Sequence, residues 1–337
     1  WVAVSLFGAL PFWMSPYFGS FTDALFEAVS AFTTTGATIL SDVEVLPPAI
    51  QFWRHFGHWL GGMGVVLLCI AVLPLIGAGG MALYRAEFSG ARSEKLQPRL
   101  AETALSLWRI YFALTLAEYT LLRFAGMARF DAVCHSFSTM GTGGFSTLTA
   151  SVGGFHNPAV EYIIIAFMFL AGLNFTQHYR LWVRGDARSF FGDMEVRGFA
   201  AILAASTAII TWGLLRHTPM EVEEAVRKAL FQVVSIGSTT GFATADYEHW
   251  MPVSHTVLLL LMFIGGCTGS TAGGWKVSRV LLLGKLVYRE LLRTSHRRGV
   301  FAVRLGGQPV PEATIQSLLN LVYLSLLVFV VSLVIVS

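Results

Sequence analysis

Long apolar runs dominate this chain and limit the kinds of fold it can adopt. Such runs recur along the sequence, for example at 101–124 and 315–337, and a helix of about 20 apolar residues is what crosses a bilayer. Charged residues make up only 13% of the chain and the mean hydropathy is +0.64, whereas soluble domains carry about twice that charge. We therefore expect an all-α polytopic membrane protein in contact with lipid.

Three threonine- and glycine-rich runs interrupt the apolar chain at similar intervals. They read TTTGAT at 33–38, STMGTGGFST at 138–147 and STTGFAT at 238–244. Each follows a short segment, at 21–32, 130–137 and 222–236, that is too short to span a bilayer and is therefore expected to be re-entrant. Non-helical backbone at membrane depth persists only where it is buried in protein or lines a water-filled cavity. The pattern predicts repeated helix–pore loop–helix units around a central ion pathway.

The repeat divides the chain into four predicted units. They cover 1–80, whose first helix is truncated, 81–197 with its preceding cytoplasmic loop, 198–304 with a broken second helix and a basic tail, and 305–337, the first helix of an incomplete unit. The long helices are expected at 50–76, 101–124, 160–182, 198–215 and 315–337, with a glycine-interrupted helix starting at 253. Because both ends of the chain are abrupt, we expect it to be the middle of a longer protein.

The basic residues predict the orientation of these units. Of 23 Lys and Arg residues, 16 lie within 81–100, 180–197 and 276–304, and each range follows the second long helix of a unit. The positive-inside rule makes those segments cytoplasmic, so the re-entrant segments enter from the outside. Four acidic residues lie outside the first and third runs: Asp42, Glu44, Asp246 and Glu248. They either belong to ordinary solvated loops or raise the local cation concentration.

The chemistry of the three runs suits a cation filter. A dehydrated monovalent cation needs oxygen ligands on several sides, and backbone carbonyls supply them without a full charge that would trap the ion. One such run alone is equally well explained as a helix-capping turn. Three runs, each after a re-entrant segment and before a long helix, favour a filter built from all of them.

The same runs carry a resemblance to a known family. Together with GGCTGSTAGG at 265–274, GHWLGGMGVV at 57–66 and LYRAE at 83–87, they resemble the TrkH potassium-uptake subunits of the Trk/Ktr/HKT group over essentially the whole chain. The resemblance implies four linked units around one potassium pathway in a bacterial plasma (inner) membrane. It implies that potassium, the transported ion and the only metal expected, binds at Thr34, Thr35, Gly36, Thr142, Gly143, Gly144, Thr239, Thr240 and Gly241.

The glycine-rich stretch at 265–274 is predicted to break a helix. Each glycine costs a helix about 1 kcal/mol relative to alanine, and this stretch contains five of them. It provides either close helix packing through small residues or a flexible intramembrane loop, and the resemblance implies a gate. Its residues are Gly265, Gly266, Cys267, Thr268, Gly269, Ser270, Thr271, Ala272, Gly273 and Gly274. We interpret Lys276 and Arg279, at its inner end, as positive-inside anchors.

Partners follow from the basic tail and from the resemblance. The segment 289–304 is expected to lie near anionic lipid on the cytoplasmic side. The resemblance adds docking of a cytoplasmic nucleotide-binding ring of the TrkA type, and a homodimer. The chain has no phosphate-binding motif, so we expect no cofactor and expect any nucleotide to act through the partner. A net charge of +3 indicates no nucleic-acid partner.

The sequence shows no arrangement typical of an enzyme. His55 and His58 lie three positions apart without a third ligand nearby, and we interpret them as part of a helix end near the interface. The three cysteines stand alone in apolar contexts, as small buried hydrophobes do: Cys69, Cys134 and Cys267. The alternative to a channel-like subunit is a secondary transporter with broken helices that couples another ion to a small cation. Inverted repeats would place basic loops at alternating ends, which is not the pattern here.

Overall fold

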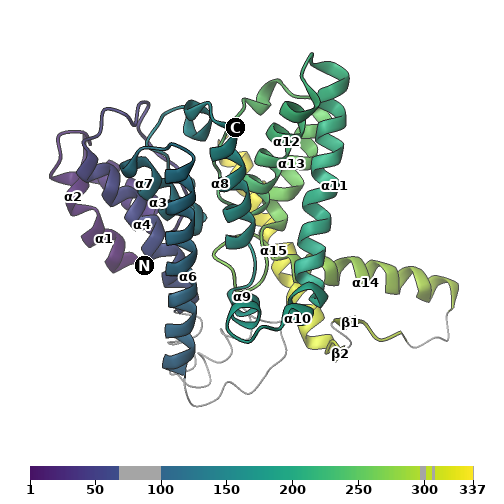
Figure 1. Ribbon diagram of the computed structural model, residues 1–337. Helices are drawn as coiled ribbons and strands as arrows, with labels where there is room; N and C mark the ends of the chain where they lie inside the picture. The colour runs from purple at the N-terminus through teal and green to yellow at the C-terminus, as the bar shows by residue number, and fades with distance from the viewer. Residues whose placement is uncertain (68–99, 297–300, 306–307, 337) are drawn as a thin grey trace.

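The computed structural model describes residues 1–67, 100–296, 301–305 and 308–336, and most of them are helical (Figure 1). The helices are α1 (Val2–Gly8), α2 (Leu10–Trp13), α3 (Phe21–Phe32), α4 (Pro48–Leu67), α6 (Leu100–Phe124), α7 (Arg129–Met140), α8 (Pro158–Ala171), α9 (Phe175–Trp182), α10 (Ala187–Gly192), α11 (Met194–His217), α12 (Val222–Gly237), α13 (Pro252–Ile264), α14 (Val277–Ser295) and α15 (Glu312–Val336). Two short 3₁₀ helices, η3 (Ser151–Phe155) and η4 (Tyr247–His249), and an antiparallel hairpin of β1 (Arg304–Leu305) and β2 (Gln308–Pro309) complete the described elements. The predicted all-α fold class is confirmed, with this one short hairpin added.

The long helices stand side by side, and several are suited to a membrane. Figure 1 shows α6, α8 and α11 upright next to one another, while α14 leaves the bundle sideways. Two described helices, α11 and α15, are long and apolar enough to cross a bilayer, and the pair α8 and α9 qualifies as a third, bent span. The predicted helix at 50–76 is α4 as far as residue 67; its remainder, Cys69 and LYRAE lie outside the described residues.

The three short segments form helices at the predicted places. They are α3, α7 and α12, and the side chain of Ser20 starts α3 by accepting a hydrogen bond from the Asp23 N–H at 3.1 Å. Each is enclosed by other helices: α3 packs on α1, α2 and α4, α7 on α4, α6 and α8, and α12 on α8, α11 and α13. Enclosure by other helices buries these segments in protein, which re-entrant segments require.

The predicted helix at 160–182 is wrong as a single element. It is broken after α8, and the axes of α8 and α9 differ in direction by 101°. The break lies at Gly172–Asn174, where Gly172 ends α8 and the Asn174 side chain caps α9 by accepting from the Thr176 N–H at 2.8 Å. Glycine is a poor helix former and asparagine is a good N-cap, so the sequence signal for this break was present.

The predicted break at 265–274 is confirmed, and it meets the break between α8 and α9. The Cys267 N–H donates to the Gly172 carbonyl at 2.8 Å, and the Phe175 N–H donates to the Gly269 carbonyl at 3.1 Å. Each irregular segment therefore satisfies polar backbone groups of the other, which buried non-helical backbone must achieve inside a membrane.

Glycines on one face of α4 let it approach two of the short helices. A Cβ on Gly57 would lie 2.8 Å from the Ala31 Cβ of α3, and one on Gly62 would lie 2.7 Å from the Gly141 Cα at the end of α7. A Cβ on Gly61 would overlap the Phe32 carbonyl oxygen. The GHWLGGMGVV phrase is thus a packing motif that brings α4 against the C-terminal ends of both helices.

The division into units remains a prediction. Its boundary after residue 80 lies outside the described residues, the boundary after 197 falls within α11, and the boundary after 304 falls within β1.

We predict that Gly61→Ala in α4 destabilises the full-length protein. The added methyl group has no room beside the Phe32 carbonyl, and overpacking typically costs about 1–3 kcal/mol. The measurement is the thermal melting of purified protein in detergent. Gly284→Ala in α14 is the matched control, because a Cβ there has nothing within 4 Å. Equal melting temperatures for the two variants would contradict this account of α4.

Candidate functional site

The helices α3, α7 and α12 end in the same backbone motif. At the first, the Thr34 N–H donates to the Ala31 carbonyl at 3.2 Å and the Thr35 N–H donates to the Ser30 carbonyl at 2.9 Å. The equivalent pairs of bonds close the ends of α7, from Thr142 and Gly143, and of α12, from Thr239 and Thr240. This pattern is the Schellman motif, which satisfies the last carbonyls of a helix.

Threonine occupies the position in this motif where glycine is usual. The φ angles of Thr34, Thr142 and Thr239 are 55°, 52° and 56°, and a β-branched residue in the left-handed region is a genuine outlier that costs about 1–3 kcal/mol. A glycine with positive φ follows two residues later in every case, with the residue between them at negative φ. Such alternation turns successive peptide groups toward the same side. We call Thr34–Gly36, Thr142–Gly144 and Thr239–Gly241 the first, second and third Thr/Gly segments.

The three Thr/Gly segments lie against one another in order. A Cβ on Gly36 would overlap the carbonyl oxygen of Gly143, and a Cβ on Gly144 would overlap that of Thr240. The first segment therefore touches the second, and the second touches the third, each through a glycine that leaves no room for a side chain. A Cβ on Gly241 would have nothing within 4 Å. The structure thus brings all nine predicted ion-binding residues together.

The electrostatics at this meeting point favour a cation. The C-terminal end of a helix carries a partial negative charge, equivalent to about half an elementary charge. Because α3, α7 and α12 each end at a Thr/Gly segment and the segments touch, three such ends face one region. The three segments differ in their exposure to solvent: Thr35 and Gly241 are exposed, whereas Gly143 in the middle segment is buried.

The residues 265–274 form a loop closed at its neck. The Trp275 N–H donates to the Phe263 carbonyl and the Lys276 N–H to the Ile264 carbonyl, both at 2.9 Å. Inside the neck, Gly265 and Gly274 have φ angles of 70° and 79° and pack so closely that a Cβ on either would collide with the other. The chain therefore leaves α13, makes the loop, and returns to begin α14 at nearly the same place.

This loop touches the Thr/Gly segments directly. The Gly273 N–H donates to the Thr239 Oγ1 at 2.6 Å. The Thr271 hydroxyl lies 3.1 Å from the Met140 carbonyl, at the end of α7, and 3.3 Å from the Ala171 carbonyl, at the end of α8. The ten predicted gate residues thus lie beside the predicted filter residues, in contact with two of the three segment-bearing helices.

Glu195 holds the far side of the loop, and sequence reasoning missed it. Its Oε1 accepts from the Thr268 N–H at 2.6 Å, from the Thr268 hydroxyl at 2.8 Å and from the Ser278 N–H at 3.1 Å. The signal in the sequence was an acidic residue at the start of α11, directly after a basic loop, but nothing there indicates partners 73 and 83 positions away.

Lys276 is a second residue whose role the sequence did not reveal. The prediction of a positive-inside anchor is wrong for it, because the side chain is buried and its Nζ donates to the Ala272 carbonyl at 2.5 Å. The residue also has a φ of 77°. It therefore ties the end of the loop to the neck from inside the protein rather than from the lipid surface.

Two of the four acidic residues join the loops that follow the first two Thr/Gly segments. The Thr149 hydroxyl donates to the Asp42 Oδ1 at 2.9 Å, and the Thr149 N–H donates to the Glu44 Oε1 at 3.1 Å. These carboxylates are therefore structural links between the first two repeats as well as exposed charges. Asp246 instead caps η4 by accepting from the Glu248 N–H at 3.0 Å.

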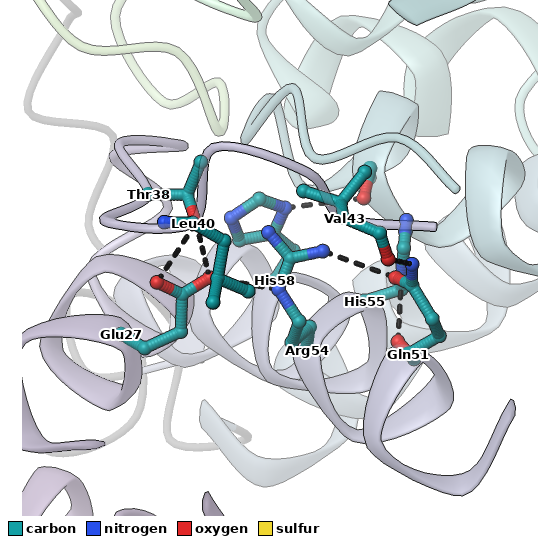
Figure 2. Close-up of polar contacts among 9 residues, drawn as sticks. Glu27, Thr38, Leu40, Val43, Gln51, Arg54, His55 and His58 are labelled. Atoms are coloured by element: carbon teal, nitrogen blue, oxygen red, sulfur yellow. Dashed lines mark hydrogen bonds and ion pairs between the residues drawn. The ribbon is translucent and has the colours of Figure 1, made fainter. Parts of the chain in front are cut away.

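A buried polar cluster lies behind the first Thr/Gly segment (Figure 2). The Arg54 Nε donates to the Glu27 Oε1 at 2.7 Å, and both side chains are almost fully buried. His55 and His58 are also completely buried, so the prediction that they belong to a helix end near the interface is wrong. The α4 helix places them in the protein interior, where His58 Nδ1 and Ser138 Oγ of α7 are 3.1 Å apart.

The described part of the chain holds no cluster of side chains suited to a metal ion. No three of its His, Cys, Asp and Glu side chains are grouped so that they hold a metal ion. Cys134 and Cys267 are buried and unpaired with each other, as expected of small hydrophobes.

Comparisons with known proteins agree with this geometry. The TrkH family profile, described as cation transport protein, matches residues 1–337. The chain is 43% identical over 335 residues to the Trk system potassium uptake protein TrkH of Salmonella typhimurium, covering 98% of this chain and 69% of that protein. It is 42% identical over 319 residues to the TrkH of Halomonas elongata, covering 94% and 66%.

A solved structure is similar over the same extent. The crystal structure of the potassium transporter TrkH from Vibrio parahaemolyticus superposes with a TM-score of 0.88 at 40% identity, covering 98% of this chain and 68% of that one. The chain thus spans about two thirds of the length of these relatives. Sequence and fold agree: the chain belongs to the TrkH family of cation transport proteins.

Proposed function

We propose that this protein takes up potassium across the bacterial plasma (inner) membrane, through a filter formed by its Thr/Gly segments. The observation that carries the proposal is the contact of the last glycine of the first and of the second segment with a carbonyl of the next segment, Gly36 with Gly143 and Gly144 with Thr240. An ion held between the segments would meet backbone oxygens from several sides, as carbonyl-lined filters provide. Relatives with 42–43% identity are named potassium uptake proteins.

The loop at 265–274 is the gate in this proposal. Its contact with Thr239 of the third Thr/Gly segment and with the ends of α7 and α8 supports this role. The loop contains no helix or strand of its own. Individual hydrogen bonds hold it: at its neck, to Glu195, to the break between α8 and α9, to the end of α7 and to Thr239. A loop of this kind can shift without unfolding the helices on either side.

The proposed partners act from the cytoplasmic side. The basic helix α14 projects from the bundle in Figure 1, and its Val287, Tyr288 and Leu291 are 62–64% exposed. A basic helix with exposed apolar residues suits anionic lipid or a cytoplasmic ring of the TrkA type, and we propose both contacts, together with a homodimer. The relatives are transport proteins, and we propose no catalytic role and no cofactor for this chain.

We predict that Gly36→Ala and Gly144→Ala in the full-length protein abolish growth of potassium-requiring cells at low external potassium. Both changes place a methyl group onto a carbonyl oxygen of the neighbouring segment. The matched control is Gly126→Ala, which adds the same methyl group to a residue with a φ of 94° and no neighbour within 4 Å. Normal growth of the two filter variants, with expression equal to the control, would refute the filter assignment.

We also predict that deletion of residues 268–273 raises potassium flux into proteoliposomes or removes its regulation. Glu195→Gln should act in the same direction and more weakly, because it removes the charge that strengthens the bonds to Thr268 and Ser278. Glu224→Gln, at a surface ion pair with Lys228, is the control. Unchanged flux and unchanged regulation in both loop variants would exclude the gate.

A further inference from the structure

The three helices that end at the Thr/Gly segments, α3, α7 and α12, share a second feature. The residue nine positions before the glycine that ends each Thr/Gly segment is Glu27 in α3, His135 in α7 and Gln232 in α12. All three side chains are almost completely buried, with exposed fractions of 0%, 0% and 1%. Because they occupy the same turn of their helices, any common contact they make is a property of the repeat and not of one unit.

Each of these side chains reaches the chain just beyond its own glycine. The Thr38 hydroxyl donates to the Glu27 carboxylate, at 2.9 and 3.0 Å from its two oxygens. His135 Nε2 and Ser146 Oγ are 3.0 Å apart, and Thr38 and Ser146 both stand two positions after the glycine. In the third unit the Gln232 Nε2 donates to the Ala245 carbonyl at 2.9 Å.

These contacts bracket every Thr/Gly segment. The Schellman motif fixes its start to the pore helix, and the buried side chain fixes the chain just after its end to the same helix. The positions of the intervening carbonyls therefore depend on both attachments. The carboxylate oxygens of Glu27 are occupied by Thr38 and Arg54, so Glu27 acts on the segment from behind and does not itself face an ion.

The first segment depends on this attachment more than the other two. The residue after the glycine is a buried phenylalanine in the second and third segments, Phe145 and Phe242, and an exposed alanine, Ala37, in the first. The His58 ring stacks on Phe145 with centroids 4.1 Å apart, and the His135 ring stacks on Phe242 at 5.6 Å. The first segment has no buried aromatic side chain at this position, and the hydrogen bond between Thr38 and the Glu27 carboxylate holds it instead.

Arg54 makes this attachment a link between segments. Figure 2 shows its guanidinium between Glu27 and Gln51, where Nη1 donates to the Gln51 Oε1 at 3.0 Å. Gln51 in turn donates to the Val43 carbonyl of the outer loop at 2.5 Å. The guanidinium also lies 4.1 Å from the centroid of the Phe145 ring, directly after the glycine of the second segment. One buried cation thus holds both sides of the contact between the first two segments.

We infer that Glu27 and Arg54 are a positioning pair that sets the discrimination between potassium and sodium by fixing the first Thr/Gly segment against the second. This inference rests on the proposed potassium uptake and deepens it. A smaller ion needs ligands closer together, so carbonyls that are kept from moving inward disfavour it. The ion pair and its bond to Thr38 supply that restraint. A variant that lacks them should conduct sodium while it still conducts potassium.

The test measures potassium and sodium uptake into proteoliposomes containing the full-length protein. The double variant Glu27→Gln/Arg54→Gln removes both charges together, because removing one alone would leave a buried unpaired charge. We expect the potassium-to-sodium flux ratio to fall by about tenfold, the scale of one lost charge-assisted hydrogen bond. The matched control is Glu161→Gln/Arg227→Gln, which removes an ion pair between α8 and α12 that touches no Thr/Gly segment, and its ratio should stay unchanged.

A second pair of variants leaves the ion pair in place. Thr38→Val removes the hydroxyl that donates to Glu27 and should lower the ratio in the same direction, whereas Thr38→Ser keeps a hydroxyl and should preserve it. These variants decide the matter if the double variant fails to fold, as judged by its melting temperature. Wild-type ratios in Thr38→Val or in a folded double variant would overturn the inference, while a wild-type protein without potassium flux would instead overturn the proposed function.

Discussion

Irregular backbone inside a membrane must find its hydrogen-bond partners within the protein, and the other features of this structure follow from that requirement. The helices α3, α7 and α12 meet it with Schellman motifs, and the loop at 265–274 meets it with a backbone-bonded neck. The break between α8 and α9 meets it by pairing with that loop. The predicted filter, the predicted gate and the helix break are therefore one hydrogen-bonded assembly, in which a shift of one element changes the partners of the next.

The strained threonines belong to the same assembly. A glycine at the position of Thr239 would relieve the cost of a positive φ, but it would remove the Oγ1 that accepts from the Gly273 N–H. At Thr142 the hydroxyl donates to the Gly141 carbonyl at 2.7 Å. In both cases the hydroxyl satisfies a backbone group of non-helical chain, which gives a physical reason for a side chain at a position where the motif usually has glycine.

The local features of this fold were predictable from the sequence, and the contacts between distant segments were not. Apolar length, Thr/Gly runs and clustered glycines predicted α3, α7, α12 and the break after α13, because these depend on short-range propensity and on the bilayer. The break at Gly172 was missed although Gly172 and the N-cap Asn174 signalled it, because the apolar run that precedes them was extended into the next segment. Glu195, Arg54 and His58 were missed or misread because their partners lie on other helices, and a single sequence does not indicate which charge meets which backbone group.

The three buried attachments also differ in chemistry, as a carboxylate, an imidazole and an amide at one repeated position. In a channel assembled from identical subunits, a single substitution behind the filter is present in every subunit and changes all sides of the filter together. Here the repeats belong to a single polypeptide. The residues behind each Thr/Gly segment are therefore encoded separately, and one can be substituted without the others. Substitutions can then change the ion preference of one Thr/Gly segment at a time. Three different residues at one repeated position, Glu27, His135 and Gln232, are the expected result of such separate changes.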